Sequence, residues 1–124
     1  MPNVLVVEDE ANILKLVSVN LFSRGYEVAE AKNGTEALDQ LRLKLPSLMV
    51  LDIKLPDFTG WDLLKKIKGD PKIKDDFPVL IMTASITDAY VDLESYPSVT
   101  EVLIKPFSTV KLVSAVERAL RKRG

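Results

Sequence analysis

Residues 48–57 read Leu-Met-Val-Leu-Asp-Ile-Lys-Leu-Pro-Asp, and this stretch decides the fold. Its first four residues are apolar, with Pro46 and Ser47 before them and a proline turn soon after. A short continuous apolar run bounded in this way predicts a strand that is buried on both faces, as in parallel sheets. The strand ends on Asp52. Because ligands of open α/β sheets bind at the carboxyl ends of central strands, Asp52 is the first candidate for a functional site.

Three further predicted strands also end on reactive or polar side chains. They span residues 4–7, 79–82 and 102–104. The side chains that follow them are those of Glu8 and Asp9, of Thr83, and of Lys105. Taken singly, each has an ordinary structural explanation: Asp9 as a helix cap, Thr83 as a strand residue and Lys105 as a solvated charge. The functional argument therefore depends on all four strand ends together.

Strand and helix patterns alternate from one end of the chain to the other, which predicts an α/β fold of five β-α units. Expected helices cover residues 8–24, 35–44, 60–68 and 109–122. Residues 86–98 have the weakest pattern, with Tyr90, Leu93 and Tyr96 on one side of a short helix. Residues 26–31 alternate apolar and polar side chains, as expected for an edge strand. Right-handed crossovers then leave few topologies, and a flavodoxin-like (βα)5 doubly wound parallel sheet with strand order 2-1-3-4-5 is one of the two common ones. We expect this order because it places the alternating strand at an edge.

Length and composition limit the classes of protein that are possible. The 124 residues fit one domain, spanning 1–124, and the net charge of −1 gives no footprint for nucleic acid or an anionic membrane. Cysteine and histidine are both absent, which excludes disulfides, thiol metal sites and a histidine base. The N-terminus shows no signal peptide, and no apolar run is long enough to span a membrane. We therefore expect a cytoplasmic protein.

Strand order 2-1-3-4-5 places Glu8, Asp9 and Asp52 in one cleft, where three carboxylates repel one another unless a cation compensates them. Oxygen ligands without histidine or cysteine suit Mg²⁺. A carboxylate beside Mg²⁺ can act as a nucleophile in aspartyl-phosphate chemistry. Thr83 and Lys105 would then supply a hydroxyl and an ammonium group for the phosphoryl oxygens.

The four motifs together resemble the receiver domain of two-component response regulators, the CheY-like family. They are Glu8-Asp9, Asp52 with Leu55-Pro56-Asp57 and Gly60, Thr83-Ala84, and Lys105-Pro106-Phe107. The similarity covers the whole chain, and the four motifs in this order are far more specific than any one of them. The resemblance implies that the protein is a phosphorylation switch in a phosphorelay. It would be a phosphoprotein rather than a turnover enzyme, and its own dephosphorylation would be slow.

Individual roles follow from the same resemblance. Asp52 would accept a phosphoryl group from a histidine kinase or a histidine phosphotransfer domain. Mg²⁺ would be held by Glu8, Asp9, Asp52 and the backbone carbonyl of Lys54. Thr83 and Lys105 would bind the phosphoryl group, and the Lys105-Pro106 peptide bond would be cis. The chain would be a monomer or a phosphorylation-dependent dimer without direct contact to nucleic acid or membrane.

Several positions depart from the family pattern or extend it. Val102 occupies the place of the usual aromatic switch residue, and Ser98-Val99 replaces a small Gly-Ala pair, so we expect an altered output face. The Lys54 ammonium group is expected near the phosphoryl group or in solvent. Ile13 and Leu14 are expected in a docking patch on the first helix. Trp61 is expected in the core, and Phe107 in packing.

Three alternatives remain open from the sequence. A phosphatase of the haloacid dehalogenase type would need a second Asp where Lys54 stands, and would carry its nucleophile on the first strand. A nucleotide-binding domain would need a glycine-rich phosphate loop, which is absent. A degenerate receiver that serves only as an interaction module is opposed by the complete acid set but supported by Val102.

The chain shows no output domain after residue 124, so it either acts alone or is a fragment.

Overall fold

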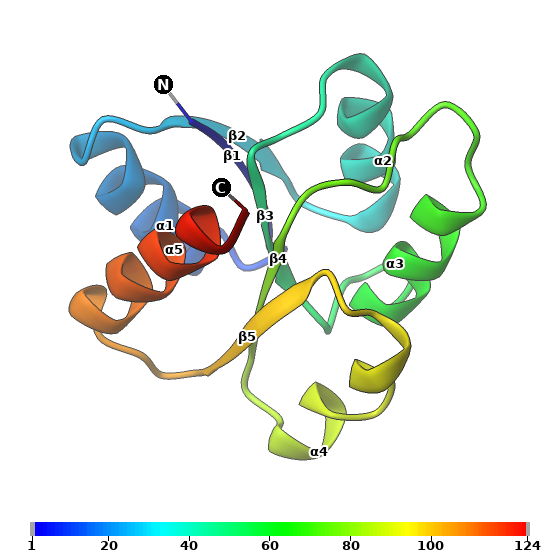
Figure 1. The fold of residues 1–124 in the computed structure, drawn as a ribbon. Coiled ribbons are helices and arrows are strands. Elements are labelled where there is room, and N and C mark those ends of the chain that lie inside the picture. The colour runs from blue at the N-terminus through cyan, green and yellow to red at the C-terminus, as the bar shows by residue number, and fades with distance from the viewer. Residues whose placement is uncertain (1, 124) are drawn as a thin grey trace.

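The computed structural model describes residues 2–123 as one five-stranded parallel sheet with helices on both faces (Figure 1). The strand order β2-β1-β3-β4-β5 confirms the predicted topology. The strands are β1 (Asn3–Val7), β2 (Glu27–Ala31), β3 (Leu48–Asp52), β4 (Val79–Thr83) and β5 (Val99–Ile104). The helices are α1 (Ala11–Ser23), α2 (Gly34–Leu43), α3 (Gly60–Lys68), α4 (Ile86–Ala89) and α5 (Thr109–Arg123), with one 3₁₀ turn at Leu93–Ser95.

The sheet divides the apolar core into two layers. Alternate strand residues such as Val6 and Val50 pack with α1 and α5 on one face, whereas Val7 and Leu51 pack with α2 and α3 on the other. β3 and β4 are buried along their whole length, which is why their sequences are apolar up to the terminal residues Asp52 and Thr83. The alternating strand β2 lies at an edge of the sheet, as predicted.

Local sequence signals set the helix ends. The Asn33 side chain caps α2 by accepting a hydrogen bond from the backbone N–H of Glu36 at 2.7 Å. Thr59 and Asp62 form a reciprocal capping box at the start of α3. Gly25 ends α1 with φ of 94°, a left-handed conformation that glycine adopts without steric cost. The caps at Asn33 and Thr59 follow β2 and β3, so they position loops at the carboxyl edge of the sheet, where the candidate site lies.

The segment after β4 differs most from the expectation. Helix α4 is short, as expected, with four residues, but Tyr90 beyond it is exposed rather than part of a buried helix face. Tyr96 is buried outside any helix, where its ring stacks on Trp61 with 5.8 Å between ring centroids. The Trp61 indole N–H also donates to the backbone carbonyl of Asp88 at 2.8 Å, so a core residue of α3 holds the end of α4.

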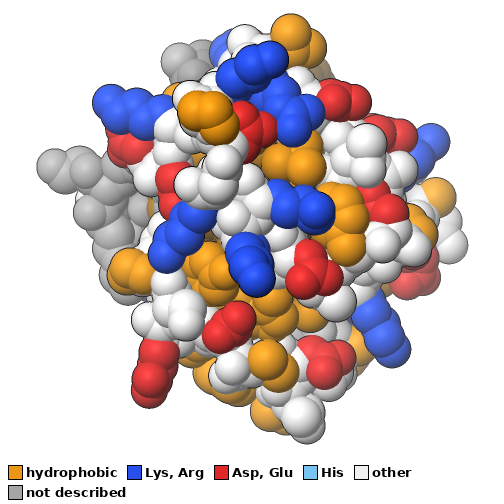
Figure 2. All heavy atoms as spheres, turned by 90° about the vertical axis from the view of Figure 1, so that its right-hand side faces the viewer, with side chains coloured by type: hydrophobic (Ala, Val, Ile, Leu, Met, Phe, Trp, Pro, Cys, Tyr) orange, Lys and Arg blue, Asp and Glu red, His pale blue; other side chains and the backbone are white. Residues whose placement is uncertain are grey.

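The face over α2 and α3 carries lysine and arginine side chains interspersed with acidic ones (Figure 2). Two of these lysines lie over aromatic rings: the Nζ of Lys66 is 5.1 Å from the Phe58 centroid, and that of Lys68 is 4.8 Å from the Tyr96 centroid. These lysine side chains therefore cover apolar surface, with their ammonium groups over the aromatic rings. Among the described residues, no helix is both long and apolar enough to cross a membrane.

Candidate functional site

The carboxyl edge of the sheet brings together the five side chains that the sequence singled out. Glu8 and Asp9 follow β1, and Asp52 ends the neighbouring strand β3, whose Leu51 pairs with Val7. Thr83 ends β4, and Lys105 follows β5. All these residues line one cleft of about 730 Å³. The structure thus places the four strand ends at one cleft.

Glu8, Asp9 and Asp52 form a compact acidic cluster. Each offers a carboxylate oxygen, and these oxygens all lie within 4.8 Å of one another. Glu8 is fully buried and Asp52 nearly so, while Asp9 faces solvent. Burial raises the pKa of Glu8 to about 7, with a further rise from the charge of Asp52, although hydrogen bonds from Lys105 and from the Glu10 backbone oppose it. The carboxylate form of Glu8 is therefore poorly stabilised by the protein alone.

Lys105 supplies the positive charge of the site. Its Nζ donates to Glu8 Oε1 at 2.5 Å and to Asp52 Oδ2 at 3.0 Å. Burial alone would lower the pKa of Lys105, but the hydrogen bonds to Glu8 and Asp52 outweigh it and raise the pKa. One ammonium group thus balances two buried carboxylates, which leaves the cluster with surplus negative charge. The Lys105-Pro106 peptide bond is cis, as the family resemblance implied.

Thr83 is buried at the side of the cleft, where its hydroxyl meets the start of α4. Its Oγ1 accepts a hydrogen bond from the backbone N–H of Ser85 at 3.2 Å. The Ser85 hydroxyl in turn caps α4 by accepting from the N–H of Asp88 at 3.2 Å. Two hydrogen bonds therefore connect the hydroxyl of Thr83, through Ser85, to helix α4.

The donor set fits a magnesium ion. Three carboxylates with surplus negative charge and without histidine or cysteine are typical of a Mg²⁺ site, since this hard cation prefers oxygen ligands. The backbone N–H of Lys54 donates to Asp52 Oδ1 at 3.2 Å, which brings the start of the β3–α3 loop against the cluster. The Lys54 side chain is exposed and lines the cleft.

Apolar side chains border the cleft on its α1 side. Ile13 and Leu16 of α1 line it. Phe107, in the segment after β5, also lines the cleft and is partly buried against the core. Leu14, expected in an exposed patch, is buried and packs in the core with Val17 and Leu21. The sequence prediction was wrong for Leu14 because the buried face of α1 includes the polar residue Ser18, which hides the true apolar stripe.

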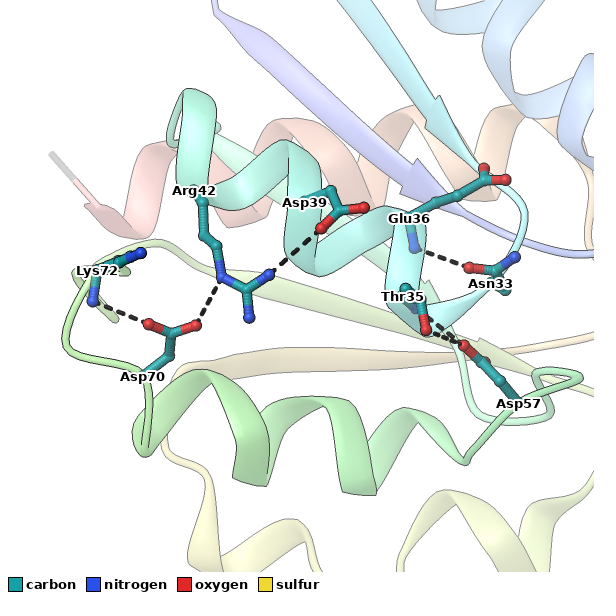
Figure 3. Close-up of polar contacts among 8 residues, drawn as sticks. All are labelled: Asn33, Thr35, Glu36, Asp39, Arg42, Asp57, Asp70 and Lys72. Carbon is teal, nitrogen blue, oxygen red and sulfur yellow. Dashed lines mark hydrogen bonds and ion pairs between the residues drawn. The ribbon is translucent and has the colours of Figure 1, made fainter.

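Asp57 was treated in the sequence only as a turn former within a family motif. In the structure its carboxylate accepts hydrogen bonds from the start of α2, including the backbone N–H groups of Gly34 and Thr35 (Figure 3). No local sequence pattern predicts this contact, because Asp57 lies in a loop more than twenty residues after the helix start that it binds.

Comparison with known proteins agrees with this geometry. The model of the response regulator receiver domain family matches residues 4–117. The chain belongs to this family. Members of the receiver family are generally phosphoacceptors rather than enzymes. The acidic pocket of this receiver is consistent with a switch operated by phosphorylation of an aspartate.

Individual relatives show how far the similarity extends. The transcriptional regulatory protein PrrA of Mycobacterium tuberculosis is 34% identical over 125 residues, which cover 99% of this chain and 52% of PrrA. The chain spans about half the length of the curated relatives it matches.

Solved receiver structures superpose over nearly the whole chain. A CheY-like receiver domain protein from Methanospirillum hungatei has a TM-score of 0.86 at 26% identity, covering 99% of this chain and 96% of its own. The response regulator TrrA of Thermotoga maritima, solved in complex with Mg²⁺ and BeF, has a TM-score of 0.80 at 31% identity. The TrrA match covers 96% of this chain and 99% of TrrA. These matches and the strand order agree on the CheY-like flavodoxin fold.

Proposed function

We propose that Asp52 accepts a phosphoryl group from a phosphohistidine on a histidine kinase or histidine phosphotransfer domain, within a phosphorelay. The observation that carries this proposal is the position of Asp52 at the cleft, adjacent to two further carboxylates and hydrogen-bonded to Lys105. In the transfer, an Asp52 oxygen attacks phosphorus, a P–O bond forms, and the P–N bond to the imidazole breaks. The chain is then a substrate and a switch rather than a turnover enzyme.

Glu8, Asp9 and Asp52, with the backbone carbonyl of Lys54, would hold Mg²⁺. When bound, the ion would neutralise charge on the phosphoryl oxygens. Fully buried Glu8 would contribute an oxygen from the floor of the site, and exposed Asp9 one from its mouth. The complex of TrrA with Mg²⁺ and BeF supports this assignment by similarity.

Lys105 and Thr83 would bind the phosphoryl oxygens. The Lys105 ammonium group already lies 3.0 Å from Asp52 Oδ2, so it needs only a small movement to pair with a phosphoryl oxygen on Asp52. The Thr83 hydroxyl would turn from the Ser85 N–H toward the phosphoryl group. Exposed Lys54 at the mouth of the cleft would influence how readily water attacks the phosphoryl group.

The partner would dock over the apolar border of the cleft. Ile13 remains in this proposal, and Leu16, which is exposed and lines the cleft, takes the place of buried Leu14. A helix that carries the donor histidine could cover Ile13 and Leu16 while its imidazole reaches Asp52. We assign residues 1–124 to a single cytoplasmic receiver domain that is a monomer or a phosphorylation-dependent dimer.

The output face of this receiver would be atypical. Val102, at the place of the usual aromatic switch residue, is half-buried and packs against the core cluster that contains Trp61 and Tyr96. A valine has no ring that can alternate between buried and exposed positions. The change at Thr83 would therefore reach the surface by another route than a ring at position 102.

Phosphorylation by a small donor tests the proposal directly. The chain is incubated with acetyl phosphate and Mg²⁺, and its intact mass is compared with that of an Asp52→Asn variant. We expect one added phosphoryl group on the natural chain, lost in the variant and when Mg²⁺ is chelated. A chain that binds Mg²⁺ but gains no phosphoryl group would contradict the proposal and favour an interaction module.

A further inference from the structure

The carboxylate of Asp57 fastens the β3–α3 loop to the amino end of α2 (Figure 3). Oδ1 accepts from the backbone N–H of Gly34 at 2.9 Å and from that of Phe58 at 3.0 Å. Oδ2 accepts from the N–H of Thr35 at 2.9 Å and from its hydroxyl at 2.8 Å. One side chain of the loop therefore satisfies two of the backbone donors that every helix leaves unpaired at its start.

The charge of Asp57 suits this position. Burial would raise the pKa of its carboxyl group, but hydrogen bonds from Gly34, Thr35 and Phe58 outweigh burial and lower the pKa to about 2. The group is thus an anion at neutral pH, placed at the positive end of the α2 dipole.

Close packing reinforces the same attachment. A Cβ atom added to Gly34 would lie 2.2 Å from the Phe58 ring, so the first residue of α2 and the loop residue after Asp57 leave no space between them. The Phe58 ring is in turn covered by Lys66 of α3. The tip of the loop is therefore held between α2 and α3.

The other end of the loop is closed beside the acidic cluster. The backbone N–H of Gly60 donates to the carbonyl of Ile53 at 2.7 Å, and the N–H of Lys54 donates to Asp52 Oδ1 at 3.2 Å. A Cβ on Gly60 would lie 2.7 Å from the Asp52 carbonyl oxygen, so the closure is tight. Lys54, Leu55 and Pro56 connect Ile53 of this closed base to the fastened tip, and all three line the cleft.

We propose that Asp57 is a positioning residue that holds the backbone of Lys54 in place to bind Mg²⁺, by anchoring the tip of the loop to α2. This inference rests on the proposed function, because it concerns the carbonyl group assigned there to the metal. Asp57 is not assigned as a metal ligand: its carboxylate contacts the start of α2 (Figure 3), and it is not among the residues that line the cleft. Its effect is on the shape of the loop.

The chain offers a matched control at the other end of α2. There Asp70, in the loop after α3, accepts from Arg42 Nε of α2 at 2.8 Å and from the backbone N–H of Lys72 at 2.9 Å (Figure 3). Asp70 also ties α2 to a loop, but it is not among the residues lining the cleft. Loss of either carboxylate loosens the attachment of α2, whereas only loss of Asp57 releases the loop that carries Lys54.

The test measures Mg²⁺ affinity and stability on the same proteins. Calorimetric titration with Mg²⁺ and thermal unfolding are carried out on the natural chain and on Asp57→Ala, Asp57→Asn and Asp70→Ala. Loss of groups that orient metal ligands typically weakens affinity by 10- to 100-fold, so we expect about a tenfold loss in Asp57→Ala. Asp57→Asn, which keeps one acceptor oxygen, should recover part of it, and Asp70→Ala should bind Mg²⁺ as the natural chain does while losing stability.

Each outcome decides the matter. Equal Mg²⁺ affinity in the natural chain and both Asp57 variants would overturn the positioning role and leave the proposed function intact. An equal loss of affinity in Asp70→Ala would also overturn it, since general loosening of α2 would then explain the effect. A natural chain that does not bind Mg²⁺ would overturn the proposed function and this inference together. If Asp57→Ala does not fold, the comparison of Asp57→Asn with Asp70→Ala makes the same distinction.

Discussion

Lys105 and Asp52 form a nearly buried ion pair, with 3.0 Å between Nζ and Oδ2 and with 13% and 6% of the two side chains exposed. Loss of one partner from a buried pair leaves an uncompensated charge. Here that charge would belong to Asp52 and to Glu8, which shares the same ammonium group. The stability of the metal-free protein therefore depends on Lys105.

We expect Lys105→Met to destabilise the metal-free protein by about 3 kcal/mol, and to be much less harmful when Mg²⁺ is saturating. Mg²⁺ should also bind more tightly to the variant, because the competing cation is gone. Urea unfolding with a chelator and with Mg²⁺ measures both effects. An equal loss of stability under the two conditions would show that Lys105 acts through packing of its side chain alone.

Trp61 provides a probe of α4 because it is the only tryptophan in the sequence. Its indole N–H donates to the Asp88 carbonyl, and Asp88 is linked through the Ser85 cap to Thr83. We expect the single indole resonance in an NMR spectrum to shift when Asp52 is phosphorylated. Thr83→Ala should still accept the phosphoryl group but show a smaller shift, and an unmoved resonance in a fully phosphorylated natural chain would contradict this route.

The hydrogen bonds to Asp57 predict a specific pH dependence of stability. The pKa of its carboxyl group falls from an ordinary 3.8 to about 2 on folding. A depressed pKa adds stability that is complete above about pH 4 and is lost as the pH falls toward 2. Asp57→Asn should therefore be less stable than the natural chain by about 1 kcal/mol at neutral pH, as for loss of a helix cap.

The stability difference between these two proteins should shrink as the pH falls from about 4 to about 2. Urea unfolding of both at several pH values measures it, and the comparison cancels the other carboxylates that titrate in this range. A difference that stays constant with pH would mean that the charge of Asp57 does not contribute.

Two glycines near α3 should respond oppositely to alanine. At Gly60 a Cβ would lie 2.7 Å from the Asp52 carbonyl oxygen and 3.0 Å from the Ile53 Cα, both backbone atoms next to the site. At Gly69, which has φ of −87°, the nearest atom would be 3.8 Å away. We expect Gly60→Ala to cost about 2 kcal/mol and Gly69→Ala to be neutral or to stabilise by about 0.5 kcal/mol. Thermal unfolding of the two variants checks the order.

The strand order and the meeting of four strand ends could be predicted because both follow from local patterns. Val50 and Leu51 lie in a fully apolar run, and residues 26–31 alternate, so the central and edge strands were distinguishable. The extent of β5 was not: it begins at Val99, three residues before the predicted start, beside an irregularity opposite Val79 and Leu80. A bulge interrupts the pairing register, and with it the two-residue periodicity that a sequence reveals.

Contacts between distant segments account for most of what the sequence did not predict. The stacking of Tyr96 on Trp61 depends on a segment without helical periodicity folding back onto α3. The attachment of Asp57 to Gly34 joins a loop to the start of a helix in a different β-α unit. In the sequence, Tyr96 looks like any core aromatic residue and Asp57 like any aspartate in a turn, so only the tertiary structure reveals their contacts.

The strand order also has a consequence for synthesis of the chain on the ribosome. After β2 pairs with β1, each later strand joins the sheet at the edge that is opposite β2: β3 on β1, β4 on β3 and β5 on β4. The sheet can thus grow in one direction as residues emerge, without insertion of a late strand between two earlier ones. Nascent chains that stop after β3 would already contain β1 and β3, the two strands at whose ends Glu8, Asp9 and Asp52 lie, whereas a chain without β1 would have a gap between β2 and β3.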